Sequence, residues 1–427
     1  MNKLLKDNFF TIITKLLIII LPFYVIIKVY LDKKLWLWFL GFFIKEFLIV
    51  LLFLSFVFSK VKNKEKIKFD TLDYLIILFI LYWIIISFVN WLWLKEIIIW
   101  WRYDFLWFVV FFIFKHSKNL LTEKRKNLLY LFLMSAWISI FLGIIVKFIT
   151  WEEILQLFGY SIYVADFDFK WWIPIYQWVE ASWIRRFQGI LDSPLAMWYL
   201  LIIYMWVFSY LNKKNLDFAY FLWFLLLASL LFLTYSRAAM LWVIIAIFLV
   251  FITYSKKIFK ILKKHKKASI SVISWIIIFI MALGYTFQDK IHNVFIRDGS
   301  TSWHFSRMMI WIDRFVEKPL WQWLSSSGPA YRYFVKETSL KTDNFYIPES
   351  WFIQILVEWW IIYFILYLLI ILAILQNLYK NKYYYIFATY IAILTMSFFL
   401  HIFEYTYLTI LLYMILWLFY TNKKNAF

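Results

Sequence analysis

The chain contains no cysteine, only 7 glycines and 6 prolines in 427 residues, and only 16% charged residues. The missing thiols exclude disulfides, cysteine nucleophiles and zinc–thiolate sites. The low charge accompanies a 65% hydrophobic composition, whereas a soluble globular protein is about half apolar. Runs of about 20 apolar residues recur along the whole length, and each could cross a bilayer as a helix. The composition is therefore that of an integral membrane protein.

Glycine is scarce where tryptophan is abundant, with 7 Gly against 27 Trp. An average chain of this length carries about 30 glycines, which is close to the two counts together. Several tryptophans stand where glycine is expected, as at 171–172, 321–323 and 359–360. We hypothesise that the source reads the UGA codon as glycine and that most of these tryptophans are translation artefacts. The alternative is an aromatic belt at the membrane interfaces, although many of the tryptophans fall within the predicted spans.

Twelve apolar segments predict an all-α polytopic membrane protein, a single integral membrane domain over residues 1–427 with about twelve transmembrane helices. The segments are 8–31, 35–59, 72–94, 97–114, 128–149, 190–211, 217–234, 238–255, 269–287, 350–376, 383–400 and 402–421. Placing the N-terminus inside puts two lysine-rich runs, 60–68 and 256–267, in inner loops, as the positive-inside rule requires. Both termini are then cytoplasmic, and the net charge of +20 reflects membrane topology rather than nucleic-acid binding.

Two predicted extracytoplasmic loops, 150–189 and 288–349, are longer than the other connections. Neither is long enough for a large independent domain, so both are expected to fold onto the helix bundle. The second shows helical periodicity from Phe305 to Phe315 and a turn at 325–329. Because it gathers arginines and carboxylates beside apolar spans, it is where chemistry on a charged or lipid-linked substrate is expected.

Arginines at the predicted outer face are candidates for anion binding. Arg185 and Arg186 precede the sixth span, and Arg237 lies at the tight turn between the seventh and eighth. An arginine at headgroup level binds phosphate well because its planar guanidinium makes two hydrogen bonds and stays charged. A snorkelling interfacial arginine is the alternative. His304 and Arg307 share a helix face at i, i+3, where a surface salt bridge is the simpler interpretation.

Carboxylates cluster at the tenth predicted span, with Glu349 directly before it and Gln354 and Glu358 within it. Glu349 could cap the helix through the helix dipole, whereas an unpaired charge at Glu358 would be costly. Asp166-Phe167-Asp168 resembles a D-x-D metal–diphosphate site, although a solvated acidic loop is the simpler explanation. Paired structural charges are the default interpretation of the remaining charged residues in or beside spans: Lys45, Glu46, Lys95, Glu96 and Asp104.

Four segments together resemble the O-antigen ligase and polymerase family of bacterial envelope glycosyltransferases. They are R-F-Q-G-I-L-D-S-P-L-A-M-W-Y-L (186–200), T-Y-S-R-A-A-M-L (234–241), S-R-M-M-I-W-I-D-R-F-V-E-K-P-L-W-Q-W-L-S-S-S-G (306–328) and P-E-S-W-F-I-Q-I-L-V-E-W-W-I-I (348–362). Each segment is loose alone, but their order and shared membrane face make the set moderately specific. The family shows P-x-x-G-x-G and E-x-G in the last two, so glycine at 321, 323, 359 and 360 would sharpen the resemblance.

The resemblance implies a lipid-linked-sugar glycosyltransferase-type bundle in the bacterial inner membrane. It implies a polyprenyl-diphosphate-linked glycan donor, no metal or other cofactor, and a hydroxyl acceptor on a glycan, lipid or protein. Arg186 and Arg237 correspond to the family arginines that hold the donor diphosphate, with Arg307 as a third. Ligases place a histidine just before the tenth-span helix as the base for the acceptor hydroxyl. This sequence departs from that pattern with Glu349-Ser350, and Glu349 is our hypothesis for the base.

A multi-span transporter or lipid-linked glycan flippase would have the same hydropathy. Transporters place polar residues near mid-bilayer and use broken helices rich in Gly or Pro, whereas these arginines gather at the outer face. We therefore expect an enzyme, either polymerase or ligase, in which diphosphate leaves into the pocket of Arg186 and Arg237. Substrate-binding roles are expected for a further set: Arg185, His304, Arg307, Gln354 and Glu358.

Overall fold

A computed structural model describes residues 9–89, 97, 101–117, 125–150, 152–161, 173–175, 177, 185–212, 218–236, 274, 298–317, 348 and 350–420. Over these residues the chain is helical and forms no strand, apart from one isolated bridge between Ser161 and Pro174. The predicted all-α fold is therefore confirmed for the described part of the chain. The candidate residues Arg237, Glu349, Asp166 and Asp168 lie outside it, as do Lys95 and Glu96.

The first predicted span is a helix interrupted at Pro22, whose ring cannot continue regular helix hydrogen bonding. It divides into α1 (Phe9–Ile20), the 3₁₀ turn η2 (Leu21–Phe23) and α2 (Tyr24–Lys33). The other elements are α3 (Trp38–Lys62), α4 (Thr71–Val89), α6 (Leu106–His116), α8 (Arg125–Phe148), η4 (Glu152–Phe158), α9 (Pro194–Leu211), α10 (Phe218–Leu233), α14 (Asp298–Glu317), α16 (Trp351–Lys380), α17 (Tyr384–Ser397), η5 (Ile402–Glu404) and α18 (Thr406–Tyr420).

Among the residues that the structure describes, six helical stretches are long and apolar enough to cross a membrane. They are Phe9–Lys33, Trp38–Lys62, Thr71–Val89, Arg125–Phe148, Pro194–Leu211 and Ile361–Lys380. Four shorter apolar helices lie within α6, α10, α17 and α18. The chain is thus a multi-pass membrane protein. The spans predicted at 238–255 and 269–287 lie outside the described residues, so the total of twelve stays a prediction.

The span predicted at 97–114 is broken in the structure, because Phe105 forms a turn between the helical residues 101–104 and α6. Two charged residues just before the break bond to neighbouring helices. Nε of Arg102 lies 3.0 Å from Oε1 of Glu46, and Asp104 accepts a hydrogen bond of 3.2 Å from the indole of Trp83. A hydropathy profile averages over about 19 residues, so it does not reveal a break of one residue within an apolar segment. Glu46 also pairs with the neighbouring Lys45, so the predicted structural pairing of those two charges is confirmed.

Ring contacts define the relative directions of the helices. α6 and α18 run parallel, whereas α4 and α16 run antiparallel. These directions follow from the contacts Trp107–Phe403 and Phe114–Trp417 for the first pair and Phe79–Tyr367 and Tyr82–Tyr363 for the second. The same directions are expected if the third, fourth, tenth and twelfth predicted spans alternate across the membrane.

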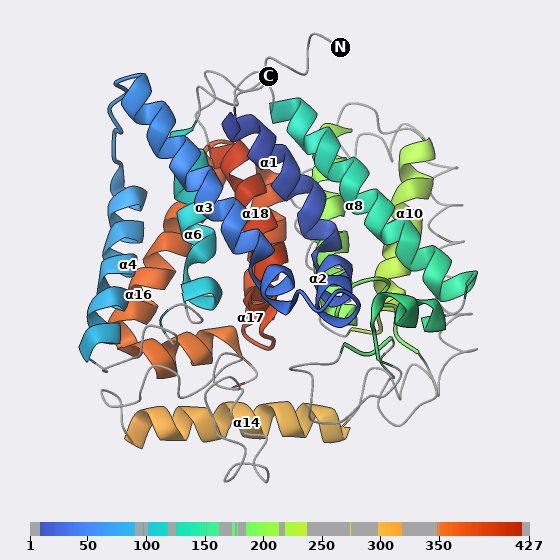
Figure 1. The fold of residues 1–427 in the computed structure, drawn as a ribbon. Helices are drawn as coiled ribbons and strands as arrows, with labels where there is room; N and C mark the ends of the chain where they lie inside the picture. Colours follow the sequence, from blue (N-terminus) through green and yellow to red (C-terminus); the bar gives the residue numbers. More distant parts are fainter. Residues whose placement is uncertain are drawn as a thin grey trace.

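The bundle has two distinct ends. At one of them α14 lies across the other helices (Figure 1) and packs against the start of α16, where Trp311 contacts Ile353 and Val357. We call this the arginine end, because Arg186 and the turn between α17 and α18 also lie there. The helical periodicity predicted from Phe305 to Phe315 is confirmed by α14.

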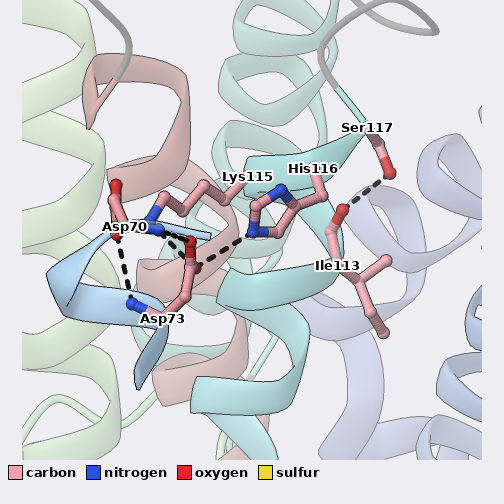
Figure 2. Close-up of polar contacts among 6 residues, drawn as sticks. All are labelled: Asp70, Asp73, Ile113, Lys115, His116 and Ser117. Carbon is pink, nitrogen blue, oxygen red and sulfur yellow. Dashed lines mark hydrogen bonds and ion pairs between the residues drawn. The ribbon is translucent and has the colours of Figure 1, made fainter. Parts of the chain in front are cut away.

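The opposite end carries a network of charges between the start of α4 and the end of α6 (Figure 2). The side chains of Asp70 and Asp73 each accept a hydrogen bond from the other's backbone N–H, which caps α4. Lys115 and His116 end α6 and lie 2.8 and 3.0 Å from Oδ1 of Asp73. Carboxylates at a helix N-terminus and cations at a C-terminus also complement the helix dipoles. The start of α4 and the end of α6 therefore meet at this end of the bundle.

Candidate active site

The segment 185–193 ties the start of α9 to the end of α10. Nε of Arg186 donates a hydrogen bond of 2.9 Å to the carbonyl oxygen of Thr234, and the backbone N–H of Phe187 donates one of 2.9 Å to Leu233. Thr234 stands three residues before Arg237 in the chain. The structure thus brings Arg186 against the turn that leads to the other arginine expected at the donor diphosphate.

Local sequence explains how this segment is held. Gly189 has φ +60°, and a Cβ there would collide with Met197 and lie 3.0 Å from the Cα of Gly143. Only glycine combines that left-handed conformation with so close an approach of two backbones. Ser193 then caps α9 by accepting a hydrogen bond from Ala196, and Pro194 occupies the first helical turn. These features fix the chain between Arg186 and α9.

Arg185 faces a different group from its neighbour Arg186. Its guanidinium lies 3.0 Å from Glu152 and 3.8 Å from Glu153, both in η4. Lys147 at the end of α8 lies 2.7 Å from the same Glu152. The charge of Arg185 is therefore balanced within the protein, and the substrate contact expected for it stays a prediction.

The start of α16 is packed against the turn between α17 and α18. Ser350 caps α16 by accepting a hydrogen bond of 3.4 Å from Ile353, and the ring of Phe352 stacks on Phe398 at 4.2 Å. One turn further, Gln354 donates a hydrogen bond of 3.3 Å to Glu358, and both side chains are buried. The structure therefore brings these two expected substrate-binding residues together.

α14 supplies the remaining described candidates. Arg307 is buried and His304 is half-buried, on the helix that packs through Trp311 onto α16. The contacts of Trp311 are with Ile353 and Val357, which directly precede Gln354 and Glu358 in the chain. Arg307 is therefore buried rather than at the surface that the salt-bridge interpretation assumed, and its role stays a prediction.

Comparison with known proteins identifies the central part of the chain. Residues 222–368 match the family model described as O-Antigen ligase. The chain carries an O-antigen ligase domain. This match confirms the resemblance predicted from the sequence, and together with the apolar helices it supports a role in polysaccharide biosynthesis at a membrane, of the ligase or polymerase type. No curated protein and no solved structure matches the chain in the same comparisons.

The O-antigen ligase domain includes most of α10, Thr234, all of α14 and most of α16. Arg186 lies before the domain in sequence, yet its hydrogen bond to Thr234 joins it to the domain in space. Within the described residues, no group of three or more His, Asp and Glu side chains is arranged to hold a metal ion.

A line of polar groups connects the segment 185–193 to the start of α18, outside the O-antigen ligase domain. The hydroxyl of Tyr407 donates a hydrogen bond of 3.0 Å to Asp192, and Ser193 donates one of 2.7 Å to the hydroxyl of Tyr405. Burial raises the pKa of the Asp192 carboxyl, while the bond from Tyr407 and the charge of Lys28 act in the opposite direction. These hydrogen bonds hold the turn before α18 against the segment 185–193, which carries Arg186.

That turn contains a histidine–carboxylate pair that sequence reasoning missed. Nδ1 of His401 lies 2.8 Å from Oε1 of Glu404, and the His401 side chain is only 8% exposed. The charges of Glu404 and Arg186 both act on the hydroxyl of Tyr405, in opposite directions. The i, i+3 spacing of His401 and Glu404 in a short turn could have predicted this pair. The turn lies between two predicted apolar spans, so its polar residues were not singled out.

Proposed function

We propose that this O-antigen ligase-type protein transfers or polymerises a glycan from a polyprenyl-diphosphate donor at the extracytoplasmic membrane surface, and that the arginine end faces that side. The observation that carries the proposal is the hydrogen bond from Arg186 to Thr234. It supports a common site for Arg186 and Arg237, the two arginines expected to hold the diphosphate. Two guanidinium groups can neutralise a diphosphate without a metal ion, because each makes paired hydrogen bonds to phosphate oxygens.

The proposed reaction is a direct displacement at the anomeric carbon of the donor sugar. The acceptor hydroxyl oxygen forms a bond to that carbon, and the bond from the carbon to the diphosphate oxygen breaks. Negative charge grows on the leaving diphosphate, so Arg186 and Arg237 bind the transition state more tightly than the ground state. Glu349, next to the cap of α16, orients or deprotonates the acceptor hydroxyl.

The other candidate residues bind substrate or position the arginines in this proposal. Arg307 adds a third positive charge from α14, with His304 on the same helix. Gln354 and Glu358 form a hydrogen-bonded pair in α16 that would contact the sugar. Arg185 lies beside Arg186 and holds η4 against the segment through Glu152.

The glycans of a strain lacking this gene test the proposal and separate its two forms. Single repeat units that remain on the carrier lipid, with long chains lost, would identify a polymerase. Long chains that stay on the carrier but are missing from the surface would identify a ligase. An unchanged glycan profile would contradict both and would favour a transporter.

The donor-site assignment has its own test. We expect Arg237→Ala to abolish transfer while the amount of protein in the membrane is unchanged, because the variant loses a charge that stabilises the leaving group. Activity close to that of the wild type would contradict the assignment. Glu349→Gln should lower activity less if Glu349 only orients the acceptor.

A further inference from the structure

The turn between α17 and α18 lies between the two halves of the proposed site. On one side, its residues Phe398 and Phe403 contact Phe352 and Trp351 at the start of α16. On the other side, Tyr405 accepts the hydrogen bond from Ser193 in the segment of Arg186. The turn is therefore placed between the expected acceptor end of α16 and the expected diphosphate arginine.

A histidine and a carboxylate lie at ion-pair distance within this turn. Nδ1 of His401 faces Oε1 of Glu404 at 2.8 Å, and more than nine-tenths of the His401 side chain is buried. Nδ1 and Nε2 of His401 and Oε1 of Glu404 are all buried, and none of the three atoms makes a hydrogen bond to another described residue, so the contact within the pair is a close ion-pair contact. A buried polar atom of this kind costs free energy unless it serves a ligand or a reaction. A carboxylate beside one ring nitrogen stabilises the imidazolium that forms when the other nitrogen accepts a proton.

We propose that His401 is the general base of the transfer reaction and that Glu404 is the residue that positions it. The inference rests on the proposed function, and it deepens that function by naming the group that takes the acceptor proton. Nε2 of His401 receives the proton from the acceptor hydroxyl as the oxygen bonds to the anomeric carbon. The electron pair of the breaking bond leaves with the diphosphate at Arg186, and Glu404 stabilises the imidazolium that forms. Glu349 then keeps only the orienting role.

The test uses the purified full-length chain in lipid nanodiscs. The donor is the polyprenyl-diphosphate-linked glycan that accumulates in the strain lacking this gene, and the acceptor is the one that the glycan profile identifies. We expect His401→Ala to lower kcat by about 10²- to 10⁴-fold, which is the usual contribution of a general base. Added imidazole should restore part of the lost activity, because it can enter the space that the side chain leaves.

A matched control exists at the opposite end of the bundle. His116 pairs with Asp73 at 3.0 Å, so His116→Ala removes a similar histidine–carboxylate pair far from the proposed site. That variant should keep its turnover and should not respond to imidazole. For Glu404, we expect Glu404→Gln to lower kcat with little change in KM, and Glu404→Asp to retain more activity than Glu404→Gln. If Glu404 had a purely structural role, both variants would lower the melting temperature, and Glu404→Asp would retain no more activity than Glu404→Gln.

Two outcomes would overturn the inference alone, and a third would show failure of the proposed function. Full turnover by His401→Ala, with Arg186→Ala inactive, would leave the transfer reaction intact and remove His401 from it. Lost turnover of His401→Ala with a lowered melting temperature and no imidazole response would give His401 a structural role. If His401→Ala and Arg186→Ala both kept full activity, the proposed function itself would fail.

Discussion

Replacing Arg186 by alanine tests the donor site most directly. The change removes the hydrogen bond from Nε to the Thr234 carbonyl, together with the guanidinium proposed to bind the diphosphate. Loss of one donor that acts on developing charge typically costs about 2.7–4 kcal/mol, or roughly 10²- to 10³-fold in kcat. We therefore expect Arg186→Ala to lower kcat by roughly that factor.

Arg186→Lys separates the charge from the shape of the guanidinium. Lysine keeps one positive charge, but a single ammonium group cannot reproduce the planar fork that bonds to Thr234 and to a phosphate together. Loss of one charge-assisted hydrogen bond costs about 1.5–3 kcal/mol, which corresponds to about 10- to 150-fold in rate. The lysine variant should therefore fall between wild type and Arg186→Ala.

The assay measures initial rates with purified protein and isolated lipid-linked donor, at saturating and at low donor concentration. Lys33→Ala is the control, because Lys33 is a partly exposed cation at the end of α2 that pairs with Asp32 at 3.6 Å. It should leave kcat unchanged. If Arg186→Ala raised KM without lowering kcat, Arg186 would bind donor and transition state equally, and the proposed stabilisation of the leaving group would be refuted.

Two further predictions concern stability. Gly189→Ala should lower the free energy of unfolding by about 1–2 kcal/mol from backbone strain alone, and by more through the collision with Met197, measured as a lower melting temperature in detergent; an unchanged melting temperature would contradict the strained turn. Asp73→Asn should destabilise the protein by about 3–5 kcal/mol, because it leaves buried Lys115 with less compensation beside His116, and a loss below about 1 kcal/mol would show that Asp70 compensates.

The apolar runs predicted the long apolar helices of the described region, because a bilayer allows only hydrogen-bonded backbone to cross it. Periodicity also predicted α14, whose packing face repeats at helical spacing. The predicted ends of the helices were less accurate where a polar side chain caps the helix. The span predicted to start at residue 190 begins as a helix at Pro194, because Ser193 provides the cap.

The candidate site was only partly predictable, because it depends on contacts between distant parts of the chain. The bond from Arg186 to Thr234 joins residues 48 positions apart, and no local pattern encodes such a pairing. The motifs did predict that both segments belong to one site. The pair of His401 and Glu404 could not be placed without the packing of Tyr405 against Ser193, which only the folded chain provides.

The hypothesis that glycine underlies many of the tryptophans can be argued further from the packing. Several indole N–H groups are buried without a hydrogen-bond partner among the described residues, including those of Trp107, Trp198, Trp206 and Trp417. Each such group costs about 1–3 kcal/mol, which is hard to reconcile with a stable membrane bundle. Glycine at these positions would carry no such group and would let helices approach closely, as small residues do in membranes.

Mass spectrometry of the protein purified from its own source decides the question. We expect the peptide from Lys318 to Arg332 to contain glycine at 321 and 323, and peptides from α9 to contain glycine at 198 and 206. Intact tryptophan at both 321 and 323 would refute recoding. The buried indoles would then belong to the natural protein, and their unpaired N–H groups would need bound lipid or glycan as partners.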